Sequence, residues 1–182
     1  MTYDNADVIL AIEKDPEAFS RLYRSVYRDL YRLAWYSLSE KESAEDAVSE
    51  AVTDAWKGIQ SLKQPEAFGF WITKILIRKC NAILRERYNR AQEMPGDISD
   101  LETVCAADVR SERDLLRSEA RTDLERGIMA LSDTDREIIS LCVVAGYKSE
   151  EAGLILSMNS STVRSRLNRA LAKLRNTLYD AT

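Results

Sequence analysis

The sequence predicts an all-α protein in which an acidic, flexible linker joins two small helical domains. Three observations support this fold class. Apolar residues recur at the three- and four-residue spacing of amphipathic helices over most of the chain. Only six Gly and three Pro occur in 182 residues, too few for the turns of an all-β fold. One stretch, 93–108, loses the helical spacing and holds five acids without a base.

The N-terminal domain is expected to cover residues 1–92. Its first helix keeps apolar side chains on one face from Phe19 to Ala34. Ser43 and Asp46 have the spacing of a capping box and predict where a second helix begins. The expected order is a helix from Pro16, the capped helix through Ile59, a turn with Pro65 at 60–67, and a third helix at 68–88.

The linker is expected to span 93–122 and the C-terminal domain 123–182, a helix-turn-helix. Helical spacing resumes near Ser111. Polar residues at 132–135 predict an N-cap, and Gly146 predicts a helix end. The expected helices are Arg136 to Ala145, Ser149 to Leu156 and Ser160 to Leu178.

Composition excludes several function classes. With 45% hydrophobic and 31% charged residues, the chain has enough apolar residues for a core and is not expected to be disordered. It has no histidine and no Gly-rich phosphate loop, and Cys80, Cys105 and Cys142 form no CxxC pair. We therefore expect no catalytic site, no metal site, no cofactor and reduced thiols.

The protein is expected to be located in the cytoplasm. The N-terminal residues carry acids where a signal peptide would carry Lys or Arg. The apolar stretches fall far short of the ~20 residues that span a bilayer.

The end of the chain has the proportions of a helix-turn-helix. A helix at 149–156 is followed by a joint at 157–159 and a longer helix, in which residues 160–175 hold five bases and no acid. Such joints often use Gly for a positive φ, and here Ser157 occupies that place. The arrangement predicts DNA binding, with the last helix in the major groove.

The faces of this last helix have different expected roles. An apolar stripe packs on the preceding helices, and at about 100° per residue the opposite face is polar. Small polar side chains and one Arg suit contacts with base edges, while Arg164 and Arg166 flank the stripe and can reach phosphates. The stripe is Val163, Leu167, Ala170, Leu171 and Leu174, and the polar face is Ser161, Ser165, Asn168 and Arg169.

The helix at 68–88 carries a second basic surface, since residues 70–90 hold six bases against one acid. Basic side chains beside aromatic rings suit single-stranded or melted DNA, whose bases leave the stack. For Trp71 we expect core packing. The polar stripe is Lys74, Arg78, Asn81 and Arg85, and the aromatic residues are Phe68, Phe70 and Trp71.

The helix after Ser43 carries an acidic stripe of Asp46, Glu50 and Asp54 at every fourth position. Like charges at this spacing cost about 0.2–0.5 kcal/mol per pair in an isolated helix. No partner for them is expected within the chain. A basic protein partner explains the stripe, and a solvated face is the other explanation.

These features together resemble the sigma factors of bacterial RNA polymerase, specifically the small two-domain extracytoplasmic-function group and its Gram-positive branch. The resemblance covers nearly the whole chain, and the string at 161–175 is its most specific part. The segments that carry it are AEDAVSEAVTDAW (44–56), FGFWITKILIRKCNAILRER (68–87), ALSDTDREIISL (130–141) and STVRSRLNRALAKLR (161–175).

The resemblance implies a transcription initiation factor that directs core RNA polymerase to specific promoters, often in a stress response. The acidic helix would bind a coiled coil of the largest polymerase subunits. The basic helices would read the minus-ten and minus-thirty-five elements of promoter DNA. An anti-sigma factor, usually membrane-anchored, would hold the protein inactive, and no small-molecule substrate is implied.

The residues implied for each partner are grouped by element. Polymerase contacts are Asp46, Ser49, Glu50 and Asp54; minus-ten contacts are Lys63, Lys74, Arg78, Lys79, Asn81 and Arg85; minus-thirty-five contacts are Ser161, Thr162, Arg164, Ser165, Arg166, Asn168, Arg169 and Lys173.

Two other functions stay open from the residues alone. A free-standing helix-turn-helix regulator would use only the C-terminal domain and leaves the acidic and central basic helices unexplained. A helical adaptor that binds only proteins would leave both basic faces merely solvated.

Overall fold

The computed structural model describes residues 1–93, 124 and 126–180, and these ranges contain helices, turns and irregular segments but no strand. The all-α prediction is therefore confirmed. The third helix, predicted to end at residue 88, runs on to Glu93, the first residue of the predicted linker. The rest of that linker and the predicted return of helical structure near Ser111 fall outside the described residues.

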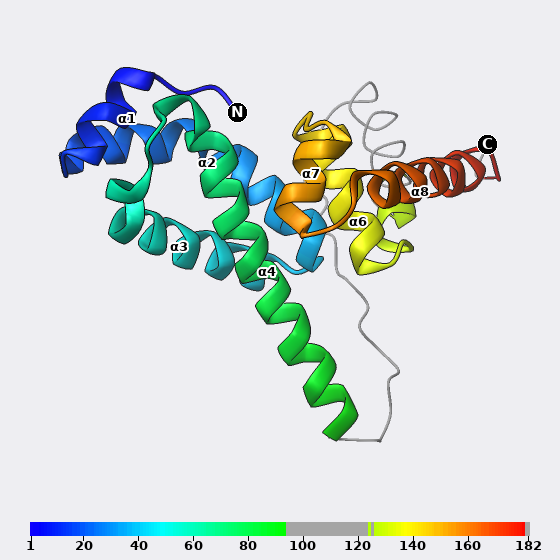
Figure 1. Cartoon of the computed structure of the whole chain (residues 1–182). Coiled ribbons are helices and arrows are strands. Elements are labelled where there is room, and N and C mark those ends of the chain that lie inside the picture. Colours follow the sequence, from blue (N-terminus) through cyan, green and yellow to red (C-terminus); the bar gives the residue numbers. More distant parts are fainter. Residues whose placement is uncertain (94–123, 125, 181–182) are drawn as a thin grey trace, which may run out of the picture.

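The N-terminal half is a helical bundle (Figure 1). Helices α2 (Pro16–Leu38), α3 (Lys41–Gly58) and α4 (Phe68–Glu93) pack against one another, and α1 (Asn5–Ile12) packs on α2. Asp15 caps α2 by accepting the backbone N–H groups of Glu17 and Ala18 at 2.8 and 3.0 Å. The C-terminal half of α4 projects from the bundle (Figure 1).

Three local expectations for this half are corrected. Helix α1 was not expected, because its eight residues are too few for a clear periodic pattern. Helix α3 begins at Lys41 after Glu40, and Ser43 does not cap it, because the Ser43 hydroxyl donates to the Glu40 carboxylate at 2.6 Å. The turn at 60–67 includes parts of two short 3₁₀ segments, η1 (Ile59–Ser61) and η2 (Pro65–Ala67).

The C-terminal half consists of α6 (Asp133–Ile139), which continues as the π-helical turn η3 (Ser140–Val144), followed by α7 (Ser149–Leu156) and α8 (Ser160–Asp180). Ser132 caps α6, because its hydroxyl accepts the Asp135 N–H at 3.3 Å. Gly146 has φ 77° and follows the π-helical turn, as expected for a helix end. The helix predicted to run to Ala145 is thus an α-helix followed by a π-helical turn.

The two halves share one hydrophobic core. Helix α6 packs against α2, and α7 packs against α4 (Figure 1). A smaller cluster holds α6 and α8 together around Ile128, Ile139 and Leu174. Leu171, expected in the apolar stripe of α8, is 39% exposed, because it lies at the rim of a cavity. The C-terminal residues in the shared core are Ile138, Leu141, Ala152, Ile155 and Val163.

No helix within the described ranges is long and apolar enough to cross a membrane. Cys80 is buried and Cys142 half-buried, and both are free thiols. Burial raises the pKa of Cys80 to about 12, so this thiol stays protonated.

Candidate nucleic-acid interface

Helices α7 and α8 form the predicted helix-turn-helix. Ser157 has φ 56° and takes the left-handed conformation, as expected for the first joint residue. The Met158 N–H donates to the Gly153 carbonyl oxygen at 2.8 Å. A Cβ on Gly153 would lie 2.7 Å from the Met158 carbonyl oxygen, so the tight joint requires glycine there. Asn159 then caps α8 by accepting the Ser161 N–H at 3.0 Å.

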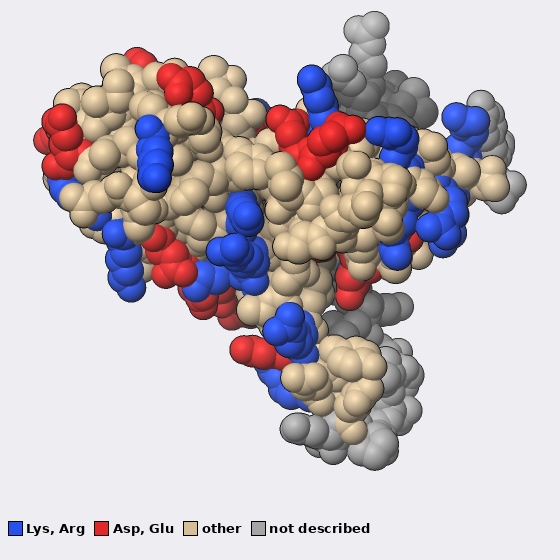
Figure 2. All heavy atoms as spheres, in the orientation of Figure 1, with Lys and Arg blue, Asp and Glu red and all other residues tan. Residues whose placement is uncertain are grey.

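The polar face of α8 is open to solvent. Arg169 makes a single hydrogen bond, from Nε to the Ser165 carbonyl oxygen at 3.5 Å within its own helix. A side chain held this weakly can be redirected toward a base edge. Lys and Arg gather over α8 (Figure 2). The exposed residues of the predicted set are Ser161, Thr162, Arg164, Ser165, Asn168, Arg169 and Lys173.

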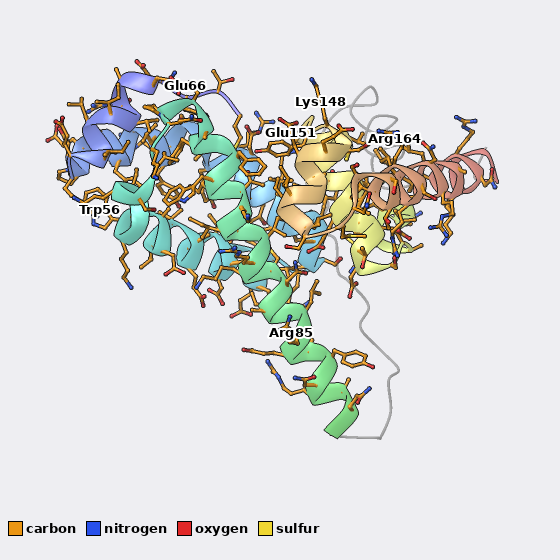
Figure 3. All side chains as sticks on the ribbon, in the orientation of Figure 1. Trp56, Glu66, Arg85, Lys148, Glu151 and Arg164 are labelled. Atoms are coloured by element: carbon orange, nitrogen blue, oxygen red, sulfur yellow. The ribbon has the colours of Figure 1, made fainter. Side chains whose placement is uncertain are left out.

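The two arginines that flank the stripe are engaged within the protein. Arg164, at the start of α8 (Figure 3), pairs with Glu150 of α7 at 3.1 Å, and both side chains are well exposed. Arg166 is held more firmly, because its Nε donates to Asp135 Oδ1 at 2.8 Å in a half-buried site. A phosphate contact by Arg166, which stays a prediction, would require Arg166 to leave Asp135.

The basic stripe of α4 is free of ion pairs within the described chain. Arg78 and Arg85 are exposed, and Lys74 and Asn81 are half-buried. Arg85 lies on the projecting part of α4 (Figure 3), and Figure 2 shows basic side chains on one side of that part, with acidic ones among them. Lys63 is exposed in the loop between η1 and η2.

Lys79 does not join this stripe. Its Nζ lies 2.7 Å from Asp54 and 3.2 Å from Glu50, so it faces α3. The hydrogen bond from Lys79 lowers the pKa of Asp54. The hydrogen bonds to Asp54 and Glu50 raise the pKa of Lys79. The expectation that the acidic stripe has no partner within the chain is therefore wrong for Glu50 and Asp54.

The N-terminal end of the acidic stripe is open to solvent. Asp46 and Ser49 are exposed, and Asp46 forms no ion pair with another described residue. Asp46 is consequently the carboxylate of the stripe that is free to meet a partner's cation.

Tyr3 fixes the loop that leads into α4, a role that the sequence did not indicate. Its hydroxyl donates to the Glu66 carbonyl oxygen at 2.7 Å and accepts the Gly69 N–H at 3.1 Å. Its ring meets Phe68 edge-on, with centroids 5.2 Å apart. Chain-distant contacts of this kind have no signal in local periodicity.

Arg87 ties the α2–α3 turn to α4. Its guanidinium donates to the Leu38 carbonyl oxygen at 2.9 Å and to the Ser43 hydroxyl at 2.6 Å, and it pairs with Glu40. These charge-assisted bonds hold the start of the acidic helix α3 against the basic helix α4.

Tyr147 joins the two halves. Its hydroxyl lies 3.0 Å from Thr73 Oγ1 and 3.2 Å from the Gly69 carbonyl oxygen, and its ring meets Phe70 edge-on. Burial raises the pKa of Tyr147. A residue from the turn before α7 is thus inserted at the first turns of α4.

A cavity of about 710 Å³ opens between α2 and the C-terminal half. Three of its apolar lining residues, Leu124, Val143 and Leu171, are among the most exposed large hydrophobic side chains described. Arg32 and Arg175 also line it, and neither forms an ion pair with a described residue. Among the described residues no group of His, Cys, Asp and Glu could hold a metal ion.

Comparison with known proteins gives matches over both halves. A family model described as Sigma-70 region 2 matches residues 22–90, and one described as Sigma-70, region 4 matches residues 121–174. The chain is 30% identical over 165 residues to the probable RNA polymerase sigma factor RfaY of Xanthomonas campestris, of which it spans only 40% of the length. It is 29% identical over 171 residues to the ECF RNA polymerase sigma factor SigM of Mycobacterium tuberculosis, covering 93% of this chain and 82% of SigM.

Among solved structures, the chain is similar to the sigma factor RpoE of Bartonella quintana, which was crystallised with the anti-sigma factor NepR. The TM-score is 0.73 at 25% identity, and the match covers 88% of this chain and 96% of RpoE.

Proposed function

This chain is an extracytoplasmic-function sigma factor of the sigma-70 family, and from that premise we propose that it binds core RNA polymerase and directs it to specific promoters. It acts as a binding factor rather than an enzyme, in the cytoplasm, where bacterial polymerase transcribes the chromosome. The observation that carries the proposal is that the basic stripe of α4 and the polar face of α8 fall in the two matched regions, 22–90 and 121–174.

In this proposal α8 reads the minus-thirty-five element. Ser165, Asn168 and Arg169 face the base edges, and Ser161, Thr162 and Lys173 contact the surrounding backbone. Their exposure and the weak bond of Arg169 support this role. Arg164 reaches a phosphate after leaving Glu150, a small cost for an exposed pair.

Helix α4 reads and helps to open the minus-ten element. Support comes from the unpaired stripe of Lys74, Arg78, Asn81 and Arg85, with Lys63 in the loop before it. We assign Lys79 instead to the acidic face, because it is bonded to Asp54 and Glu50.

The face of α3 with Asp46, Ser49, Glu50 and Asp54 binds the polymerase. Asp46 supplies the unpaired charge, and Lys79 orients the other two carboxylates. A coiled coil with basic residues at the contact fits this face by charge.

Promoter binding requires the two halves to separate. Elements roughly 25 base pairs apart, as their names state, are about 85 Å apart at 3.4 Å per base pair. A compact chain of this length has a radius of gyration of about 16 Å. One packed molecule cannot place α4 and α8 on both elements, so the packed arrangement is an inactive one.

An anti-sigma factor, membrane-anchored as is usual in this group, holds the packed arrangement. RpoE of Bartonella quintana was crystallised with an anti-sigma factor, NepR. The cavity between α2 and the C-terminal half suits its docking. Exposed apolar side chains beside the unpaired Arg32 and Arg175 fit an amphipathic helix with acidic flanks.

Two measurements separate this function from its alternatives. Purified core polymerase is tested for co-elution with the chain, and the complex is tested for transcription from DNA that carries candidate promoters. A free-standing regulator would bind specific DNA without polymerase, and an adaptor would bind polymerase without any effect on promoters. Binding together with promoter-dependent transcription supports the proposal, and absence of polymerase binding overturns it.

A further inference from the structure

A carboxyl group is buried near the contact between the two halves, and one of its oxygen atoms has no hydrogen-bond partner in the described part of the chain. The Glu137 side chain is 4% exposed, and its Oε1 atom has no donor within reach among residues 1–93, 124 and 126–180. It lies on α6, which packs against α2. Burial is the main cause of the raised pKa of the Cys80 thiol on α4, and the charge of Glu137 adds to it. An unpaired buried carboxylate loses its hydration without compensation, so the protonated form is favoured here.

The groups on its own helix leave Glu137 uncompensated. Burial raises the pKa of Glu137 from 4.5 to about 7; the charge of Asp133 adds to this effect, and that of Arg136 opposes it. Arg136 pairs with Asp133 and donates to the carbonyl oxygens of Met129 and Leu131. Its buried Nε has no hydrogen-bond partner among the described residues and therefore does not donate to Glu137.

The packed helices supply no neutralising partner either. Helix α4 presents the Cys80 thiol, which stays protonated because of its own raised pKa. Helix α2 presents Ser37, whose hydroxyl donates to the Leu33 carbonyl oxygen. Helix α8 contacts α6 through Arg166, which is bonded to Asp135, about 200° around α6 from Glu137.

We propose that Glu137 is a pH-sensitive latch: the two halves stay packed while its carboxyl is protonated, and they separate as it ionises. The latch goes beyond the proposed function, because it concerns the isolated chain and needs neither polymerase nor DNA.

The direction and size of the effect follow from proton linkage. In the separated state Glu137 regains water and its ordinary pKa of 4.5, whereas in the packed state the pKa is about 7. Below pH 4.5 both states hold the proton. Between these two pKa values, each unit of pH shifts the equilibrium about tenfold toward the separated state. The difference of about two and a half units gives a total shift of roughly 300-fold, and this shift is complete above pH 7.

Small-angle X-ray scattering of the full chain measures the separation as an increase in radius of gyration. The series runs from about pH 5 to about pH 8 at constant ionic strength, because linkage predicts the change in that window. Glu137→Gln has the same shape without the charge, and Glu13→Gln is a matched change at an exposed residue of the N-terminal half. Circular dichroism at each pH establishes that every variant is helical.

We expect the wild-type chain and Glu13→Gln to expand as the pH rises, and Glu137→Gln to stay compact throughout. A wild-type radius that is constant over the series would overturn the latch. So would expansion of Glu137→Gln to the same extent as the wild type, or loss of the expansion in Glu13→Gln. None of these outcomes depends on whether the chain binds polymerase.

Discussion

The Tyr147 hydroxyl lies 3.0 Å from Thr73 Oγ1, a contact that links the turn before the helix-turn-helix to the start of α4. The same hydroxyl donates to the Gly69 carbonyl oxygen at 3.2 Å. The helix that is proposed to read the minus-ten element is therefore bonded directly to the half that is proposed to read the minus-thirty-five element.

Tyr147→Phe should loosen this contact and retain the edge-on packing against Phe70. Loss of the hydroxyl removes its hydrogen bonds and should lower the free energy of unfolding by about 0.5–1.5 kcal/mol. Urea unfolding of the full chain measures the change. Tyr88→Phe is the control. Tyr88 is 65% exposed, so loss of its hydroxyl should change the free energy of unfolding by under ~0.5 kcal/mol. Equal stability of both variants would contradict the role of Tyr147.

The two arginines of α8 should differ in what their removal changes. Arg169→Ala should relax preference at one base pair of the upstream element, since an Arg–guanine contact discriminates by about 1–3 kcal/mol. Arg166→Ala should instead destabilise the C-terminal half by about 1.5–3 kcal/mol through loss of its charge-assisted bond to Asp135. A promoter panel with holoenzyme and thermal unfolding of each variant separate these effects. A change of base preference in Arg166→Ala at unchanged stability would reverse the assignment.

Asp46→Arg should weaken binding to core polymerase and leave the helical fold intact. Asp46 is exposed and unpaired, so its replacement should change stability by under ~0.5 kcal/mol. Glu17→Arg makes the same charge change at an exposed site on α2 and serves as the control. Fluorescence titration with core polymerase measures both affinities, and identical values would favour a merely solvated acidic face.

Arg87→Ala should destabilise the N-terminal half by about 1.5–3 kcal/mol, because Arg87 supplies charge-assisted bonds to Leu38, Glu40 and Ser43. Arg90 lies one turn further on and pairs with Glu86 in an exposed site. Arg90→Ala should therefore change stability by less than ~1 kcal/mol. Similar losses in the two variants, measured by urea unfolding, would show that Arg87 does not anchor the turn.

Local patterns predicted the elements whose ends carry strong signals. Pro16 marks the start of α2, and Ser132 and Gly146 mark the ends of the segment that holds α6. The joint at Ser157 was predicted from the lengths of the helices around it. Each of these signals is a property of a few consecutive residues.

Contacts between distant segments could not be predicted in this way. From the sequence, Lys79 is one more base on a basic helix. In the folded chain α3 places Asp54 2.7 Å from its Nζ atom. From the sequence, Arg166 is predicted to contact a phosphate. In the folded chain α6 places Asp135 beside it. Packing of the two halves, with Glu137 buried in α6, depends on tertiary geometry and has no counterpart in the spacing of residues.

Transcription from a library of randomised promoters by core polymerase and the purified chain tests the central claim most directly. Sequencing of the transcribed templates identifies any enriched elements. We predict two enriched elements separated by a constant spacing, with Arg169→Ala altering only the upstream one and substitution of Arg78 altering only the downstream one. Transcription that is no greater than with core polymerase alone, or templates without any enriched element, would contradict the account.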